Sequence, residues 1–241
     1  MTASPHLSVV VPVFNERDNV TPLIDEIVAA LRGLRSFEIV YVDDCSRDDT
    51  LDVLKRLKSD VPELRVIKHN SQSGQSTAIR TGVKQAHGAW IATLDGDGQN
   101  DPADIPKLLA EREKSAADVK LFAGWRVKRK DTGSKRWASK IANAIRSRML
   151  RDATPDTGCG IKLFEREAFL DLPYFDHMHR YLPALMQRAG WKTVSVPVNH
   201  RHRASGVSKY NNLNRALVGL RDLRGVAWLN VRSKRTAIEE L

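Results

Sequence analysis

The chain has 241 residues, 41% of them hydrophobic, and a formal net charge of +10 at pH 7. This is enough apolar material for one large globular domain, with or without an appended segment. Its two cysteines exclude a disulfide framework and favour a reducing compartment. No apolar run approaches the roughly 18 residues of a membrane-spanning helix, and the amino terminus is a poor secretion signal, so we expect a cytoplasmic protein.

Strand and helix patterns alternate through the first half of the chain. Buried-strand patterns occur at 7–14, 37–44, 64–70, 89–95 and 118–124, and helical patterns fill the intervals at 15–34, 46–60, 74–88 and 101–116. This alternation predicts an α/β fold with a mostly parallel sheet and helices on both faces. In such a sheet the ligand site lies beyond the carboxyl ends of the strands.

The rhythm of the pattern changes after residue 124. We predict a basic helical stretch at 134–150, a helix near 179–189, a strand at 192–203 and an amphipathic helix at 211–231. Arginines, a tryptophan and leucines alternate in the last of these, a mixture that suits a helix lying in a membrane interface. We therefore expect a domain over residues 1–210 and a basic membrane-interface segment over residues 211–241.

Positive charge is concentrated in the second half of the chain. Residues 125–151 hold ten Lys and Arg against one acid, and residues 199–235 hold nine against one, so the remainder is net −7. This distribution predicts an anionic partner, which can be nucleic acid, a lipid headgroup or a phosphorylated substrate.

Acidic residues gather where three of the predicted strands end. The first strand runs into Phe14-Asn15-Glu16, the second ends in Asp43-Asp44 and the fourth runs into Asp95-Gly96-Asp97. Carboxylates packed this closely repel each other unless a cation lies between them. The stretch "LDGDGQNDP" (94–102) is therefore a candidate cation site.

This stretch admits four interpretations. A calcium loop beginning at Asp95 fails, because its sixth position is Asn100 rather than Gly and its twelfth is Pro106 rather than Glu. A phosphatase-type aspartate nucleophile is disfavoured, because Gly98-Gln99 stand where a hydroxyl residue usually follows the Asp-x-Asp pair. A divalent cation held by a carboxylate pair against nucleotide phosphates fits Mg²⁺ or Mn²⁺. An Asx-rich turn without a metal is the remaining alternative, but it leaves the acids on the neighbouring strand ends unexplained.

Neither GxxxxGK[ST] nor GxGxxG after a strand occurs. Five other segments do occur in order: "VVVPVFNE", "IVYVDDCSRDDT", "NSQSGQSTAIRTG", "WIATLDGDGQNDP" and "DTGCGIKLF". Together they resemble family 2 glycosyltransferases of the GT-A fold over about residues 7–210. "LDGDGQNDP", the 157–164 block and "RASGVSKY" resemble the polyprenyl-phosphate (dolichol-phosphate-type) sugar transferases within that family.

The resemblance implies a donor site for a nucleotide-sugar. Its residues would be Pro12, Phe14, Glu16, Asp43, Asp44, Gly74 and Asp95. Asp44 would accept a hydrogen bond from the base, and Asp95 would help to hold the diphosphate-sugar. Asp97 and Gln99 would ligate Mg²⁺ or Mn²⁺.

The resemblance also implies catalytic and acceptor residues. Asp97, Arg126 and Asp156 would be catalytic, with Arg126 meeting phosphate and Asp156 either a base or a turn residue. The acceptor phosphate would be bound by Lys135, Arg136, Ser139, Arg203, Ser208 and Lys209. The chain departs from the family at Lys135, where Arg is expected, and at Cys45, where Gly or Asn is usual.

The expected reaction is transfer of a sugar, with inversion, from a UDP- or GDP-sugar to a polyprenyl phosphate for cell-envelope glycan or lipid modification. A lipid phosphate is already largely anionic at neutral pH, so it needs cationic residues to position it rather than a base. We expect an enzyme that is peripheral on the inner face of the membrane, with no nucleic-acid partner. The alternatives are transfer to a sugar hydroxyl and a nucleic-acid-binding module. The motifs do not indicate an oligomeric state.

Overall fold

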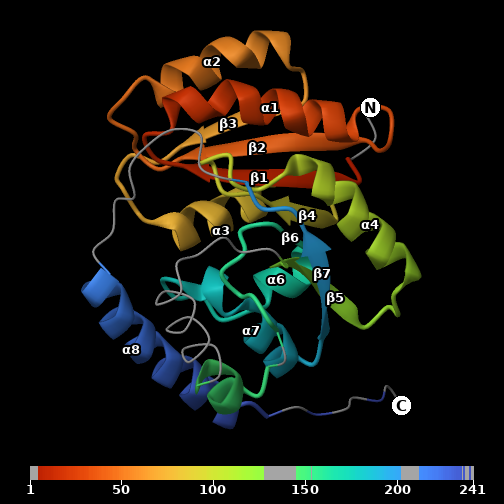
Figure 1. Cartoon of the computed structure of the whole chain (residues 1–241), viewed down its shortest axis with the longest axis vertical. Coiled ribbons are helices and arrows are strands. Elements are labelled where there is room, and N and C mark those ends of the chain that lie inside the picture. Colours follow the sequence, from red (N-terminus) through yellow and green to blue (C-terminus); the bar gives the residue numbers. More distant parts are fainter. Residues whose placement is uncertain are drawn as a thin grey trace.

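The computed structural model describes residues 5–127, 145–152, 154–201, 212–234, 236 and 239. A seven-stranded sheet in the order β3-β2-β1-β4-β6-β5-β7 lies at the centre of this described part (Figure 1). Its strands are β1 (Leu7–Val13), β2 (Phe37–Asp43), β3 (Leu64–Lys68), β4 (Trp90–Thr93), β5 (Val119–Arg126), β6 (Lys162–Glu165) and β7 (Lys192–Val198).

Helices cover both faces of the sheet, as predicted. One face packs against α1 (Arg17–Leu31), α2 (Thr50–Asp60) and α4 (Ile105–Lys114), which follows the short helix η1 (Pro102–Asp104). The other packs against α3 (Gln75–Gln85), α6 (Arg166–Leu170), α7 (Leu182–Ala189) and α8 (Asn212–Val231), with η2 (Met178–Arg180) before α7. Figure 1 shows α1 and α2 on one side of β1–β3 and α3 on the other.

The central strand β1 is buried and almost entirely apolar because both of its faces are covered. In β1, Val9 and Val11 join the core cluster that contains α1, whereas Val10 between them joins the cluster that contains α3. Side chains alternate across a strand, so a sheet buried on both faces needs a continuous apolar run rather than an alternating one.

The sheet is mostly parallel, as predicted, with one exception at β6. β1 pairs in parallel with β2 and β4, and β5 pairs in parallel with β7. β6 runs antiparallel to both of its neighbours, with Lys162 opposite Thr93 on β4 and opposite Ala123 on β5. The sequence patterns did not predict β6 or α6, because four residues with a lysine among them make no recognisable strand signal.

The second half of the chain matches the predicted elements in part. Of the helix predicted at 134–150, the structure describes residues 145–150, which are helical. The predicted helix near 179–189 divides into η2 and α7, and β7 ends at Val198, before the predicted strand end. The predicted carboxyl-terminal helix is present as α8. Among the described residues, none of the helices has the length and apolarity to cross a bilayer.

One side of α8 packs onto the body of the protein. Its Leu223 and Val226 are buried in the same core cluster as α7. The hydroxyl of Tyr181 donates to the carbonyl oxygen of Gly219 at 3.1 Å, and Asp222 Oδ2 lies 3.0 Å from His177 Nδ1. These contacts hold α8 against the segment that contains η2.

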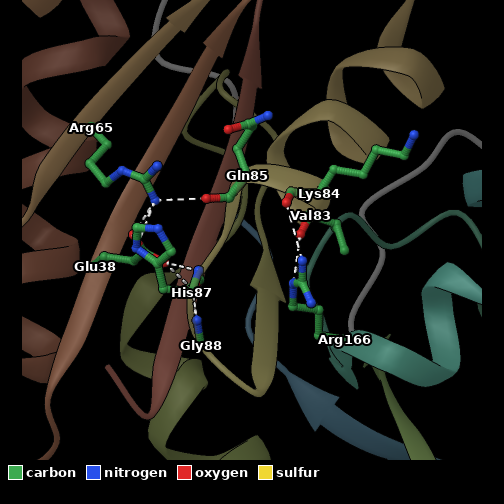
Figure 2. A network of polar contacts seen from close by, with 9 residues as sticks. Glu38, Arg65, Val83, Lys84, Gln85, His87, Gly88 and Arg166 are labelled. Carbon is green, nitrogen blue, oxygen red and sulfur yellow. Dashed lines mark hydrogen bonds and ion pairs between the residues drawn. The ribbon is translucent and has the colours of Figure 1, made fainter. Parts of the chain in front are cut away.

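A polar network closes the edge of the sheet where the parallel strands begin (Figure 2). The buried Glu38 carboxylate accepts from the Ser8 hydroxyl at 2.6 Å, the His87 amide at 2.6 Å and Arg65 at 2.5 Å. Burial alone would raise the pKa of Glu38, but these donors together lower it below its ordinary value. Arg166 donates to carbonyls at the end of α3 in the same view, which satisfies groups that a helix end leaves unpaired.

Candidate functional site

The acidic strand ends lie together at the opposite edge of the sheet. β1, β2 and β4 are adjacent and parallel, so their carboxyl ends point the same way. Pro12 is buried opposite Val42, and Phe14 lies half-buried just past the end of β1. The amide of Asp44 donates to the carbonyl oxygen of Val13 at 2.8 Å, which keeps the ends of β1 and β2 in register.

The turns after β1 and β2 are hydrogen-bonded to each other. The Asn15 amide donates to Ser46 Oγ, and the Glu16 amide donates to Thr50 Oγ1, both at 2.9 Å. Asn15 and Cys45 both have left-handed backbone conformations, with φ of 53° and 63°. Asparagine adopts this conformation readily, whereas cysteine does so at a cost. Cys45 therefore occupies a position that suits the Gly or Asn that the resemblance leads one to expect.

Asp43 and Asp44 end β2 in different surroundings. One carboxylate oxygen of the fully buried Asp43 accepts from the Ser46 amide at 3.3 Å, and the other has no hydrogen-bond partner among the described residues. Asp44 accepts from the amides of Ser73 at 2.9 Å and Gly74 at 2.8 Å. Asp44 therefore holds the loop that leads into α3, where Gly74 is the N-cap residue with φ of 86°.

The loop after β4 presents the carboxylates of Asp95 and Asp97. The amide of Asp95 donates to Asn100 Oδ1 at 3.0 Å, and the amide of Gln99 donates to Asp97 Oδ1 at 3.1 Å, so the loop is closed on itself. Gln75, the first residue of α3, donates from Nε2 to Asp95 Oδ1 at 2.8 Å. The start of α3 is thereby joined to the candidate metal loop.

Asp95 is held in surroundings that disfavour its charge. Burial of the carboxylate raises its pKa, and the neighbouring carboxylate of Asp97 raises it further. Lys162 and Arg126 act in the opposite direction without cancelling the effect. Gly160 lies so close that a β-carbon there would overlap the Asp95 carboxylate, which explains why the segment before β6 needs glycine at this point.

The residues of this loop fit a divalent cation. Among the described residues, no three His, Cys, Asp or Glu side chains gather into a complete metal site. Asp95 and Asp97 nevertheless form a carboxylate pair whose mutual repulsion is visible in the raised pKa of Asp95. Asp97 and Gln99 offer the oxygen ligands that Mg²⁺ and Mn²⁺ prefer, in a site that other oxygens would complete.

Arg126 and Asp156 form a bidentate ion pair beside this loop. Arg126 Nε and a terminal nitrogen donate to the two Asp156 oxygens at 2.7 and 2.9 Å. Desolvation alone would lower the pKa of Arg126, but the pairing with Asp156 raises it. A carboxylate held in this way is a poor proton acceptor, so the geometry suits a role for Asp156 in orienting Arg126.

Lys162, which was not predicted from the sequence, is buried and interacts electrostatically with Asp95 and Asp156. Its ammonium donates to the carbonyl oxygen of Cys159. Desolvation lowers the pKa of Lys162, while Asp95 and Asp156 act in the opposite direction. The sequence signal was a lysine within the apolar stretch "IKLF", because lysine is almost never fully buried without a partner.

Arg201, which was also not predicted from the sequence, holds the loop after β4 in place. The amide of Arg201 donates to the carbonyl oxygen of Gln99 at 3.1 Å. Its guanidinium pairs with Glu26 at 2.7 Å and with Asp101 at 2.6 Å. Arg201, three residues after the end of β7, thus fixes the backbone of Gln99, a candidate metal ligand.

The predicted acceptor residues cannot be placed beside this site, because they lie outside the residues that the structure describes. They are Lys135, Arg136, Ser139, Arg203, Ser208 and Lys209. The structure therefore brings together the predicted donor, metal and catalytic residues, and it adds Gln75, Gly160 and Lys162 to them.

Comparison with protein families matches residues 8–172 to the model described as glycosyl transferase family 2. The chain belongs to glycosyl transferase family 2. The match begins within β1 and ends after α6, so it includes the acidic strand ends, the Arg126–Asp156 pair and Lys162.

Two curated relatives narrow the comparison within the family. This family 2 chain is 36% identical over 218 residues to the dodecaprenyl-phosphate galacturonate synthase of Rhizobium johnstonii, covering 86% of the chain and 62% of the relative. It is 36% identical over 208 residues to the undecaprenyl-phosphate 4-deoxy-4-formamido-L-arabinose transferase of Pseudomonas fluorescens, covering 85% and 60%. The chain thus spans less than two thirds of each relative's length.

Solved structures share the fold of this family 2 chain. The glucosyl-3-phosphoglycerate synthase of Mycobacterium tuberculosis, in complex with Mg²⁺ and UDP, matches with a TM-score of 0.71 at 18% identity, covering 97% of the chain and 82% of the neighbour. The mannosyltransferase PcManGT of Pyrobaculum calidifontis, in complex with GDP-Man and Mn²⁺, matches with a TM-score of 0.67 at 20% identity, covering 98% and 67%. Both likenesses support the predicted GT-A fold.

Proposed function

We propose that the protein transfers a sugar from a nucleoside diphosphate sugar to a polyprenyl phosphate, with inversion at the sugar. The observation that carries the proposal is the juxtaposition of the Asp95–Asp97 loop with Arg126 and Lys162. Negative charge builds on a nucleoside diphosphate as it leaves a sugar, and a cation site with positive side chains beside it would stabilise that charge. The two curated relatives support the acceptor class, since both are named for polyprenyl-phosphate substrates.

The donor would lie across the carboxyl ends of β1, β2 and β4. In this proposal Phe14 and Glu16 contact the base and ribose together with Pro12, and Asp43 and Asp44 read the base. Asp44 retains acceptor capacity for this role, because an ionised carboxylate accepts about four hydrogen bonds. The amides of Ser73 and Gly74 and the ring of His69 use only part of that capacity.

Asp97 and Gln99 would hold a divalent cation, with Asp95 supporting the diphosphate-sugar. A cation bound there would stabilise the negative charge that develops on the departing nucleoside diphosphate. Arg126, oriented by Asp156, would place positive charge beside the same phosphates. Lys162 would contribute positive charge near Asp95.

The acceptor needs no general base in this proposal. A lipid phosphate with a second pKa near ~6 is already largely ionised at neutral pH. Its oxygen attacks the anomeric carbon while the bond to the nucleoside diphosphate breaks, so no proton has to move. The ion pair that holds Asp156 agrees with this, because the one candidate base is engaged by Arg126.

The reaction can be tested with the full chain, undecaprenyl phosphate in detergent and Mn²⁺. Labelled UDP- and GDP-sugars are offered one at a time, galacturonate and 4-deoxy-4-formamido-arabinose among them, and label is counted in the organic phase. We expect one donor to label the lipid and EDTA to abolish the label. Consumption of a donor only when a glycan is added would instead favour a sugar-hydroxyl acceptor.

We further propose that the outward side of α8 meets the membrane that contains the lipid acceptor. Leu220, Trp228 and Val231 are exposed by 45%, 60% and 84%, and spacing of three to four residues places them with the exposed Arg224 on one side of the helix. The only acid of α8, Asp222, instead faces His177. A surface that combines apolar side chains with positive charges suits a membrane that contains anionic lipid headgroups.

Sedimentation with phosphatidylcholine vesicles, with and without phosphatidylglycerol, tests this surface. Replacing Arg221 and Arg224 together by Gln should weaken binding to the anionic vesicles by about 10–30-fold, at roughly 1 kcal/mol for each arginine. A matched control replaces the exposed Arg56 and Lys58 of α2, which lies on the opposite face of the sheet. Equal losses in the two variants would contradict a surface specific to α8.

A further inference from the structure

Asp44 is fixed from two directions at the end of β2. Its carboxylate accepts from the amides of Ser73 and Gly74 on one side. On the other side its Oδ1 lies 2.7 Å from Nδ1 of His69, the residue that follows β3. The side chains of Asp44 and His69 are only 7% and 13% exposed, so this contact is largely shielded from water.

The second ring nitrogen of His69 is engaged as well. His69 Nε2 lies 2.9 Å from Oγ1 of Thr81 in the middle of α3. The backbone amide of His69 also donates to the carbonyl oxygen of Asp43 at 2.8 Å. One imidazole therefore bridges the carboxyl end of β2 to α3, with the protonation of each nitrogen set by the group it faces.

This bridge leads directly to the donor site. Asp44 holds the Gly74 amide at the start of α3, and the next residue, Gln75, donates to Asp95 in the candidate metal loop. His69 fixes this arrangement at two points, because it contacts Asp44 at the start of the path and Thr81 within α3, the helix that begins with Gln75. A shift of Asp44 would move the loop, the start of α3 and the support of Asp95 together.

We propose that His69 is a positioning residue for the nucleotide-sugar donor. It acts through Asp44, and this inference rests on the proposed function because it assigns the base to Asp44. An imidazole that donates to Oδ1 through Nδ1 holds the carboxylate in one orientation. The acceptor capacity that remains on Oδ2 beside the Gly74 amide would then face the base. Thr81 keeps the ring from rotating away by engaging Nε2.

Two substitutions separate this role from a merely structural one. In His69→Asn the side-chain amide nitrogen occupies the place of Nδ1, so it can still donate to Asp44 but cannot reach Thr81. In His69→Gln the amide nitrogen occupies the place of Nε2, so it can reach Thr81 but no longer donates a hydrogen bond to Asp44. A structural bridge loses one of its two contacts in either variant, whereas donor positioning is lost in His69→Gln alone.

The experiment measures binding of UDP and of GDP to the full chain by calorimetry in the presence of Mn²⁺. We expect His69→Asn to bind within about twofold of wild type and His69→Gln to bind about tenfold more weakly, which corresponds to the loss of one charge-assisted hydrogen bond. In the transfer assay His69→Gln should raise the KM of the sugar donor and leave the KM of the polyprenyl phosphate unchanged. Thr81→Val should give a smaller loss than His69→Gln, with Thr81→Ser as its control.

The outcomes separate the inference from the function on which it rests. Equal nucleotide affinity in His69→Asn and His69→Gln, with wild type still binding, overturns the positioning role alone. Equal increases in the KM of both substrates overturn it as well. If wild type binds neither nucleotide at any concentration tested, the proposed function fails, and the inference fails with it.

Discussion

Buried carboxylates have opposite surroundings at the amino edge of the sheet, where the parallel strands begin, and at the carboxyl edge, where they end. At the amino edge, Glu38 accepts from a hydroxyl, an amide and a guanidinium, and these donors lower its pKa. At the carboxyl edge, burial and the charge of Asp97 raise the pKa of Asp95, and one oxygen of Asp43 has no partner among the described residues. Both edges belong to the same strands, so the difference lies in the groups that surround each carboxylate.

The contrast separates residues that stabilise the fold from residues that await a ligand. A buried carboxylate whose donors are all present contributes to stability. Carboxylates that repel each other at a strand end cost stability until a cation or hydrogen-bond donor arrives. Substitution of the buried carboxylate at the amino edge should therefore change stability, and substitution of the carboxylates at the carboxyl edge should change activity.

The largest expected effect is on activity at the carboxyl edge. Asp97→Asn removes a charge from the candidate metal loop and should lower the rate of sugar transfer by about 10²–10³-fold, the size of effect seen when one group that stabilises developing charge is lost. The melting temperature should stay the same or rise, because repulsion with Asp95 is relieved. Transfer at a near-normal rate would contradict the assignment of Asp97.

Glu38→Gln should produce the converse result at the amino edge. The variant leaves Arg65 without its charged partner. It should lose about 2 kcal/mol of unfolding free energy, less than the roughly 3–5 kcal/mol of a fully buried pair because solvent screens Arg65. Urea denaturation measures the loss. Transfer activity at a temperature where the variant is folded should match wild type. A large change in rate would contradict the assignment of Glu38 to stability alone.

His179, near the carboxyl edge, makes the stability of the protein depend on pH. Its Nδ1 lies 2.7 Å from Ser76 Oγ near the start of α3, and desolvation, together with Arg180 and Lys162, holds its pKa well below the ordinary value. The unfolded chain binds a proton at this histidine first, so its neutral ring contributes stability that is lost as pH falls below about 6.5.

The size of that dependence follows from the same linkage. Protonation of this histidine in the unfolded chain should lower the unfolding free energy by about 1 kcal/mol between about pH 7.5 and about pH 5.5. In His179→Asn, which keeps a polar group for Ser76, the fall in stability over this interval should be smaller by that amount. Identical pH profiles for the two proteins, measured by urea denaturation, would exclude His179 as the source.

The smallest effect is expected at the strained turn after β2. Cys45 has φ of 63°, and an asparagine there should raise the unfolding free energy by about 0.5–1 kcal/mol. Cys45→Ala is the matched control, because it retains the strain and should give no such gain. A stabilised Cys45→Ala would show that the thiol, rather than the backbone, carries the cost.

Much of the fold could be predicted from local pattern. β1 to β5 and α1 to α4 follow from apolar runs alternating with amphipathic segments, and their order places Asp44 and Asp97 at one edge. The antiparallel β6 could not be predicted, because its pairing depends on β4 and β5 rather than on its own four residues. Local pattern also leaves open which charges pair across the fold.

The candidate site was predicted residue by residue but not as a set of contacts. The resemblance pointed to both Arg126 and Asp156, yet their bidentate pairing depends on the approach of segments that are distant in sequence. Lys162 and His69 were missed for the same reason, since each matters only through the group that folding brings against it.

The position of β6 has a consequence for how the chain is made. In the part of the chain that the structure describes, β5 and β7 join the rest of the sheet only through β6. During synthesis β5 leaves the ribosome well before its neighbour β6 exists, so its edge waits unpaired, and such edges invite aggregation. Insertion of β6 joins β5 to β4 and in the same step carries Asp156 and Lys162 to Arg126 and Asp95. The joining of the two parts of the sheet and the assembly of this side of the candidate site are thus one event.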